Sequence, residues 1–228
     1  MRPEVVPNGS VVRLAFGAIQ GVLRDPGVRW TFAIFGLAFL ASQMTRPYVP
    51  VLVEGVVPPG GALASAIAVV IGLAALAGAL VSPVGGAIGD RIGFRPVLVG
   101  ALVGGGVALL SMTIASSVGM LAASALVFAA MNAAVSAMVF GLLATEVPPE
   151  RRSATLNLAY LPLYAAGIAG PVTGAVVSSL AGLRGPFVVG AAVLVLGSAV
   201  TFVAGRRASA APGRGGRRAG GSPSSGPT

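Results

Sequence analysis

The chain contains no cysteine and no histidine, and these two absences exclude several kinds of chemistry. Disulfides, thiolate nucleophiles, imidazole bases and the usual zinc ligands all depend on one of these side chains. Acidic residues are scarce as well, with six Asp and Glu in 228 residues. No catalytic constellation remains, so we expect no enzyme activity, no metal site and no cofactor.

Charge is the other scarce property. Only 9% of the residues are charged and 55% are hydrophobic, whereas ordinary soluble domains carry about 25% charged residues. The net charge of +9 comes entirely from arginines. These arginines lie at the chain ends and in short gaps between apolar runs. That pattern is typical of membrane orientation signals, and we expect no nucleic-acid partner.

Six apolar runs are long enough to cross a bilayer, because a spanning helix needs about 20 mainly apolar residues. Strands are not expected, since the runs do not alternate and are about twice the length that a barrel strand needs. The sequence therefore predicts an all-α membrane protein with a six-span domain over residues 30–204. The predicted spans are 30–53, 63–84, 97–114, 118–145, 155–180 and 187–204.

Two polar segments flank the spans. Residues 1–29 are predicted as a cytoplasmic segment with an interfacial helix that ends at Asp25-Pro26. Its apolar face consists of Val12, Ala15, Ile19, Val22 and Leu23. Residues 205–228 are rich in Gly, Pro, Ser and Arg and are predicted as a disordered tail. With both termini cytoplasmic, thirteen of the fifteen arginines face the cytoplasm, and only Arg46 and Arg184 face outward. This asymmetry predicts a multi-pass protein of the plasma membrane with both ends inside.

The connection after the second span, "GAIGDRIGFRP" at residues 86–96, places one acid and two arginines between two long uncharged runs. Charges in any short loop can hold two helices in register. The order of the residues, however, resembles the signature G-x-x-x-D-R-x-G-R-R of the major facilitator superfamily of transporters. The match departs at Phe94 and Pro96. The residues that carry it are Gly86, Gly89, Asp90, Arg91, Gly93 and Arg95.

This resemblance implies twelve spans in two halves. It also implies that Asp90 acts across the interface between the halves and favours one access state. The stretch "EVPPERRSATLNLAYLPLYAAGIAGPVTGAVV" resembles the eleventh helix, with its preceding loop, of drug:proton antiporters in this superfamily. The first span resembles the seventh helix of multidrug efflux members. The chain is therefore interpreted as a C-terminal half.

The resemblance further implies outward transport of a small amphipathic substrate. The partners would be the lipid bilayer and either a complementary six-helix half or a second copy of the chain. An alternative is a truncated, non-transporting membrane remnant or a membrane interaction protein. No Asp, Glu or His lies inside a predicted span, so a titrating group for proton coupling is expected on another half.

Polar side chains inside the predicted spans are the candidates for a substrate site. Such groups must find partners or line a wet cavity, so interhelical packing and substrate contact are both open. Arg46 is placed near the outer interface, where snorkelling is favoured over substrate binding. The substrate-facing candidates are Gln43, Asn132, Ser136, Asn157, Tyr160 and Tyr164. The antiporter-like residues expected at helix contacts are Gly167, Gly170, Pro171 and Gly174.

Overall fold

The computed structural model describes residues 26–147 and 155–210, and every regular element within these ranges is a helix. The predicted interfacial helix and residues 211–228 of the predicted tail lie outside the described residues. The elements are α2 (Pro26–Thr45), η1 (Arg46–Tyr48), α3 (Val49–Glu54), α4 (Leu63–Ile92), α5 (Phe94–Thr113), α6 (Val118–Glu146), α8 (Tyr160–Ala181) and α9 (Gly185–Ala210).

Five helices of the described chain are long and apolar enough to cross a membrane: α4, α5, α6, α8 together with the turn that begins at Thr155, and α9. The first predicted span, 30–53, is not one continuous helix. It consists of α2, the 3-10 turn η1 and the short helix α3. The predicted fold class, an all-α membrane protein, is confirmed.

Helix α4 is longer than the predicted span 63–84, because it continues to Ile92. Gly93 alone separates α4 from α5, with a φ of 94° that favours glycine. The stretch interpreted as a loop, 86–96, is therefore mostly helical. Hydropathy marks where the apolar run ends, whereas backbone hydrogen bonding carries the helix on through polar residues. For the same reason α9 continues to Ala210, beyond the predicted end of the last span.

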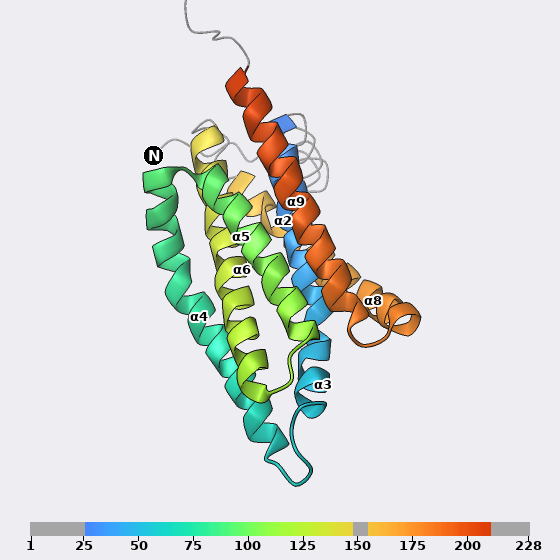
Figure 1. Ribbon diagram of the computed structural model, residues 1–228. Coiled ribbons are helices and arrows are strands. Elements are labelled where there is room, and N and C mark those ends of the chain that lie inside the picture. Colours follow the sequence, from blue (N-terminus) through green and yellow to red (C-terminus); the bar gives the residue numbers. More distant parts are fainter. Residues whose placement is uncertain (1–25, 148–154, 211–228) are drawn as a thin grey trace, which may run out of the picture.

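The neighbours of the six long helices follow a two-fold pattern. Helix α2 packs against α8 and α9, and α6 packs against α4 and α5. Helices α2 and α6 also contact each other, as do α5 and α9. Exchanging α2 with α6, α4 with α8 and α5 with α9 reproduces every one of these pairs. This is the arrangement expected of two inverted repeats of three helices, and it places α2 beside α6 and α5 beside α9. Figure 1 shows the helices in this bundle.

Aromatic and large aliphatic side chains fill the centre of the bundle. Phe35 of α2 and Phe187 of α9 are fully buried. The Phe35 ring meets Phe39 and Phe140 edge to face, with ring centroids 5.2 and 5.7 Å apart. Edge-to-face pairs of this kind stabilise by about 0.5–1.5 kcal/mol beyond the area that they bury. The contact between Phe35 and Phe140 joins α2 to α6, and the contact with Phe39 lies within α2.

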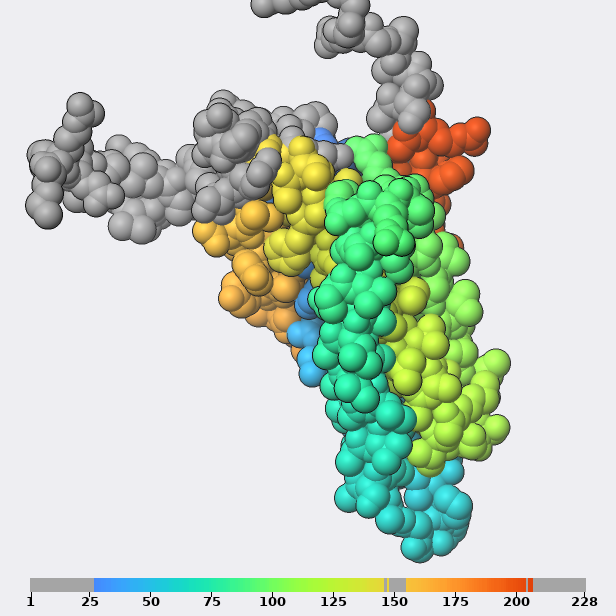
Figure 2. Space-filling model, turned by 90° about the vertical axis from the view of Figure 1, so that its left-hand side faces the viewer, coloured from blue at the N-terminus to red at the C-terminus, as the bar shows by residue number. Residues whose placement is uncertain are grey.

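Two long helices are much less buried than the others. In its most apolar window α4 is 11% buried and α8 is 17% buried, whereas α5, α6 and α9 reach 39–44%. Large apolar side chains such as Leu80 of α4 and Ile168 of α8 are mostly exposed. Figure 2 shows α4 standing along the front of the molecule, with little of the rest of the chain covering it. Both helices therefore offer long apolar surfaces.

The described chain begins and ends at the same end of the bundle. Figure 1 shows the start of α2, the turn between α4 and α5, and the end of α9 together at the top. The connections between α3 and α4, between α5 and α6 and between α8 and α9 lie toward the opposite end. The segments therefore run alternately up and down, as a multi-pass topology requires.

Candidate functional site

A cavity of about 340 Å³ lies among α2, α4, α5 and α6. Its wall is mainly apolar and includes one face of α4 between Val70 and Gly78. The volume lies within the range of about 300–1,000 Å³ that is typical of small-molecule sites. The polar residues that line it are Ser42, Thr45, Arg46 and Asn132.

The cavity reaches membrane depth. Along α4 it extends from Val70, about 10 Å from the first residue of the helix at 1.5 Å per residue, to Gly78, about 22 Å from it. On α6, Asn132 lies about 21 Å from Val118 by the same measure. Since a hydrocarbon core is about 30 Å thick, these positions fall in the middle of a span. Polar groups at this depth need partners or water.

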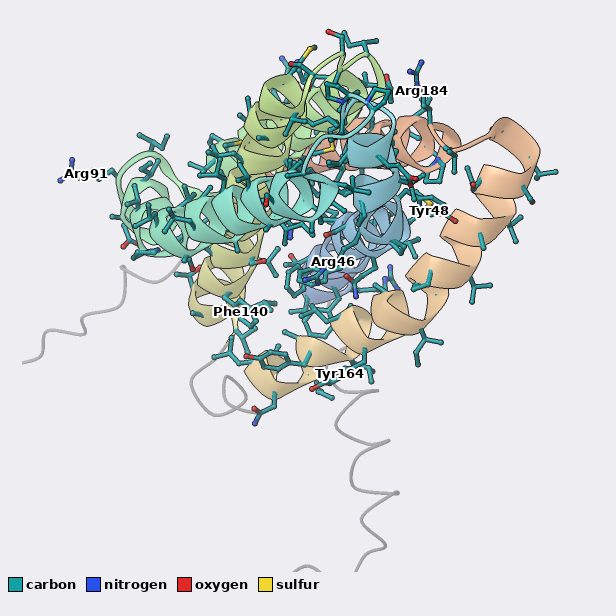
Figure 3. All side chains as sticks on the ribbon, turned by 90° about the horizontal axis from the view of Figure 1, so that it is seen from below. Arg46, Tyr48, Arg91, Phe140, Tyr164 and Arg184 are labelled. Atoms are coloured by element: carbon teal, nitrogen blue, oxygen red, sulfur yellow. The ribbon has the colours of Figure 1, made fainter. Side chains whose placement is uncertain are left out.

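Prolines determine where Arg46 stands. Pro47 and Pro50 have no N–H group, so the carbonyls of Gln43 and Arg46 lose the donors that a regular α-helix would supply. The chain passes into the 3-10 turn η1 instead, and the Val49 N–H donates to the Arg46 carbonyl. The turn places the Arg46 side chain on the cavity wall. Figure 3 shows Arg46, Phe140 and Tyr164 on the concave side of the bundle between α4 and α8.

The hydroxyl group of Thr45 is already engaged within its own helix. It donates toward the Ala41 and Ser42 carbonyls at 2.9 and 3.1 Å, and the residue is 2% exposed. Asn132, by contrast, is half-buried and lines the cavity. The Arg46 guanidinium and the Asn132 amide are therefore the strongest hydrogen-bonding side chains on the wall.

Ser136 lies one turn beyond Asn132 and does not line the cavity. Its hydroxyl donates to the Asn132 carbonyl at 3.1 Å. Of the two candidates predicted on α6, the structure brings only Asn132 to the cavity. A serine hydroxyl bound to the carbonyl four residues earlier is a common arrangement inside helices.

Gln43 faces α8 and not the cavity. A Cβ atom added to Gly170 would stand 2.5 Å from the Gln43 Cβ, and one added to Gly174 would stand 2.6 Å from the Met44 carbonyl oxygen. A Cβ atom added to Gly167 would stand 3.7 Å from the Gln43 amide nitrogen, so Gly167 is also close to α2. These glycines let the backbones of α2 and α8 approach closely. Pro171, inside α8, is exposed.

The polar residues at the start of α8 lie on its exposed surface. Tyr160 is 48% exposed and Tyr164 is 69% exposed. The Tyr160 ring packs at 5.8 Å from the ring of Phe140, on α6. Asn157, in the turn before α8, is exposed as well. None of the three predicted residues lines the cavity, although Tyr164 lies on the same concave side (Figure 3).

The residues of the signature lie at the junction of α4 and α5. Asp90 and Arg91 are exposed in the last turn of α4. A Cβ atom added to Gly89 would collide with Phe94 and Met138, whereas one added to Gly86 would meet nothing within 4 Å. Gly89 is therefore a packing residue. Arg95, half-buried, follows Gly93 in the first turn of α5.

Phe94 explains one departure from the signature. A Cβ atom added to Gly141 of α6 would overlap the Phe94 ring, as would one added to Gly89 of α4. The ring is therefore inserted between two glycines on neighbouring helices. A basic side chain at this position would have to keep its charge in water, whereas burial of the apolar phenylalanine ring stabilises the fold.

Arg46 and Ser42, neither of which was among the substrate-facing candidates, both line the cavity. Arg46 was placed near the outer interface from its position along the span alone. The signal that could have found it is the stretch "RPYVP", because prolines around a charged residue interrupt a helix at membrane depth. Within the described ranges no group of three His, Cys, Asp or Glu residues could hold a metal ion.

An all-α bundle of long apolar helices, with an open cavity that carries a few polar groups, defines the class of multi-pass membrane proteins. The family model of the Major Facilitator Superfamily matches residues 31–226. The chain therefore belongs to the major facilitator superfamily, whose members are membrane transporters and not enzymes. A search of the curated proteins gave no match.

Proposed function

We propose that the chain is the C-terminal six-helix half of a small-molecule carrier and that its cavity is part of the substrate pathway. The observation that supports this most strongly is the position of the cavity at mid-span. It lies against α2 and α6, which contact each other, and its apolar wall carries Arg46 and Asn132. A wall of this composition suits a small amphipathic molecule.

A second six-helix body would complete the carrier. Helices α4 and α8 are the least buried long helices of the described chain, and they flank the concave side that carries Arg46 (Figure 3). A complementary half or a second copy would cover their apolar surfaces. Closure on that side would turn the open cavity into an enclosed pathway through the membrane.

Asp90 is proposed to act on this second body. It is exposed in the last turn of α4, where the negative end of the helix macrodipole makes a carboxylate unfavourable. The carboxylate would be stabilised by contact with the N-terminus of a helix in the second six-helix body, because the positive end of that helix dipole lies there. Such a contact would favour one access state of the carrier.

The proposed orientation places both termini in the cytoplasm of a cell whose plasma membrane holds the protein. Arg29, Arg91, Arg95 and Arg206 belong to the segments that meet at one end of the bundle (Figure 1). Arginine-rich ends remain inside the cell. Outward transport is supported by the glycines of α8, which resemble those of drug:proton antiporters and make the close contact with α2.

Reconstitution into liposomes tests the proposed function. The full chain is studied alone and together with a candidate N-terminal six-span half, and the flux of radiolabelled amphipathic anions, cations and neutral compounds is measured. We expect flux from the paired preparation, or from the chain alone if two copies form the carrier. Asn132→Ala should lower the flux, because the cavity loses an amide, whereas Ser136→Ala, on the same helix but outside the cavity, should not.

No flux from any folded preparation would support the alternative, a membrane protein that does not transport. Equal flux from wild type and Asn132→Ala would remove the cavity from the proposed pathway. The Ser136→Ala control separates both results from a general weakening of α6.

A further inference from the structure

We propose that the cavity binds an organic anion and that Arg46 is the side chain that holds its charged group. Among the described residues that line the cavity, Arg46 alone is charged. The binding of an anion can be tested without transport. Only the statement that the anion is carried across the membrane rests on the proposed function.

The charge of Arg46 is not neutralised by an acid on the cavity wall. Among the side chains that the structure describes, the only carboxylates are those of Glu54 and Asp90, and neither lines the cavity. Glu54 is exposed at the end of α3, and Asp90 is exposed in the last turn of α4. The wall therefore presents a positive charge that a bound anion can satisfy.

A guanidinium on the wall of this cavity is suited to an oxyanion. Arginine inside a membrane domain is costly unless it pairs with an opposite charge or faces a water-filled cavity. Its planar fork binds carboxylate and phosphate oxygens through two parallel hydrogen bonds. A cation that entered the same cavity would instead be repelled, since the low dielectric of the surroundings strengthens the interaction between charges.

The surrounding residues suit an anion with an apolar body. The apolar face of α4 includes Ile71 and Ala74, and Phe128 of α6 lies beside Asn132 on the wall. The apolar part of a ligand can pack against these side chains while Arg46 holds its charged end. The Asn132 amide can donate a further hydrogen bond.

Snorkelling predicts a different behaviour. An arginine that only extends toward the interfacial water would not distinguish ligands by charge. The 3-10 turn at Arg46–Tyr48 positions Arg46 in the cavity wall, whereas snorkelling needs no helix interruption. A comparison of ligands that differ only in charge therefore separates the two roles.

Equilibrium binding to the full chain in phosphatidylcholine nanodiscs tests the inference. The probes are 4-phenylbutyrate, 4-phenylbutanol and 4-phenylbutylamine, which share one apolar body and differ in the charge of the end group. Phosphatidylcholine has no net charge, so it supplies no anionic headgroup that could compete. The variants are Arg46→Gln, Arg46→Lys and, as a matched control, Arg184→Gln. Arg184 is exposed between α8 and α9, away from the concave side (Figure 3).

We expect wild type to bind the carboxylate at least about tenfold more tightly than the amine, a ratio that corresponds to about 1.4 kcal/mol. Arg46→Gln should weaken binding of the carboxylate about tenfold and leave binding of the alcohol nearly unchanged. Arg46→Lys should give an intermediate affinity, because it keeps the charge but loses the fork. Arg184→Gln should behave as wild type.

Several results would overturn the inference. These are equal or tighter binding of the amine by wild type, unchanged binding of the carboxylate by a folded Arg46→Gln variant, and no binding of any probe. If Arg46→Gln does not fold, the inference is tested with Arg46→Lys instead. Equal affinity of that variant for the amine and the carboxylate contradicts the inference. Flux of cations alone would also overturn it while leaving the carrier function intact. Binding of the carboxylate without any flux would support it and contradict the carrier function.

Discussion

The contact between α2 and α8 leaves no room for a side chain at Gly174, and Gly174→Ala tests this directly. A Cβ atom at this position would stand 2.6 Å from the Met44 carbonyl oxygen and 3.2 Å from the Met44 Cγ and the Tyr48 ring. The nearest atom belongs to the backbone and cannot rotate away. Since carbon and carbonyl oxygen normally approach to about 3.3 Å, the two helices would have to separate by roughly 0.7 Å.

The cost can be estimated from measured effects of overpacking. Extra methyl groups in a well-packed region destabilise by about 1–3 kcal/mol. Glycine to alanine inside a helix otherwise stabilises by about 0.5–1 kcal/mol. Gly100→Ala supplies the control, because it lies within α5 and its added Cβ atom would meet nothing within 4 Å. The helix effect is common to both variants, so Gly174→Ala should be less stable than Gly100→Ala by about 1–3 kcal/mol.

The free energy of unfolding of each variant can be measured by titrating the purified chain with sodium dodecyl sulfate in mild detergent. Trp30, the only tryptophan of the chain, lies on α2 and reports through its fluorescence. Circular dichroism supplies an independent record of helix content. If Gly174→Ala proved as stable as Gly100→Ala, the close approach of α2 and α8 would be contradicted.

Three further predictions concern topology, the concave side and the junction of α4 and α5. Reporter fusions at Gly60 and Thr228 should read outside and inside, and the same side for both would contradict the topology. In a reconstituted carrier, changing Tyr160 or Tyr164 to Phe or to Ala should alter the substrate preference or the transport rate. If all four variants are expressed normally and transport as wild type does, the two tyrosines have only a packing role. Asp90→Asn should lower transport or assembly with the partner but leave the stability of the lone chain unchanged or raised by up to about 1 kcal/mol. A loss of several kcal/mol would make Asp90 an internal contact of this chain.

The membrane fold could be predicted from the sequence because hydrophobic length is a property of each segment alone. Five helices of the described chain have the length and apolarity that spanning requires, and the remaining predicted span is divided among α2, η1 and α3. The family could also be predicted, since the order of Gly89, Asp90 and Gly93 can be recognised in the sequence without knowledge of the tertiary structure. Helix ends were harder to predict, because apolarity declines before backbone hydrogen bonding does at the end of α4.

The candidate site was predictable only in part. Asn132 was singled out as a polar residue at membrane depth, and it lines the cavity. Gln43 satisfied the same criterion but faces the glycines of α8. The difference depends on which helices are neighbours, and one helix in isolation contains no such information. Arg46 was placed by its distance along the span, whereas the proline-induced turn decides where it stands.

Cysteine modification within the cavity tests the proposed pathway most directly, because the natural chain has no cysteine. Ala129→Cys would place a thiol on the cavity wall, and Leu196→Cys would place one on the exposed surface of α9, where the residue is 65% exposed. Flux in liposomes is measured before and after complete reaction with a bulky thiol reagent. We predict that modification abolishes flux through Ala129→Cys and leaves flux through Leu196→Cys unchanged. Undiminished flux through fully modified Ala129→Cys would contradict a substrate pathway through this cavity.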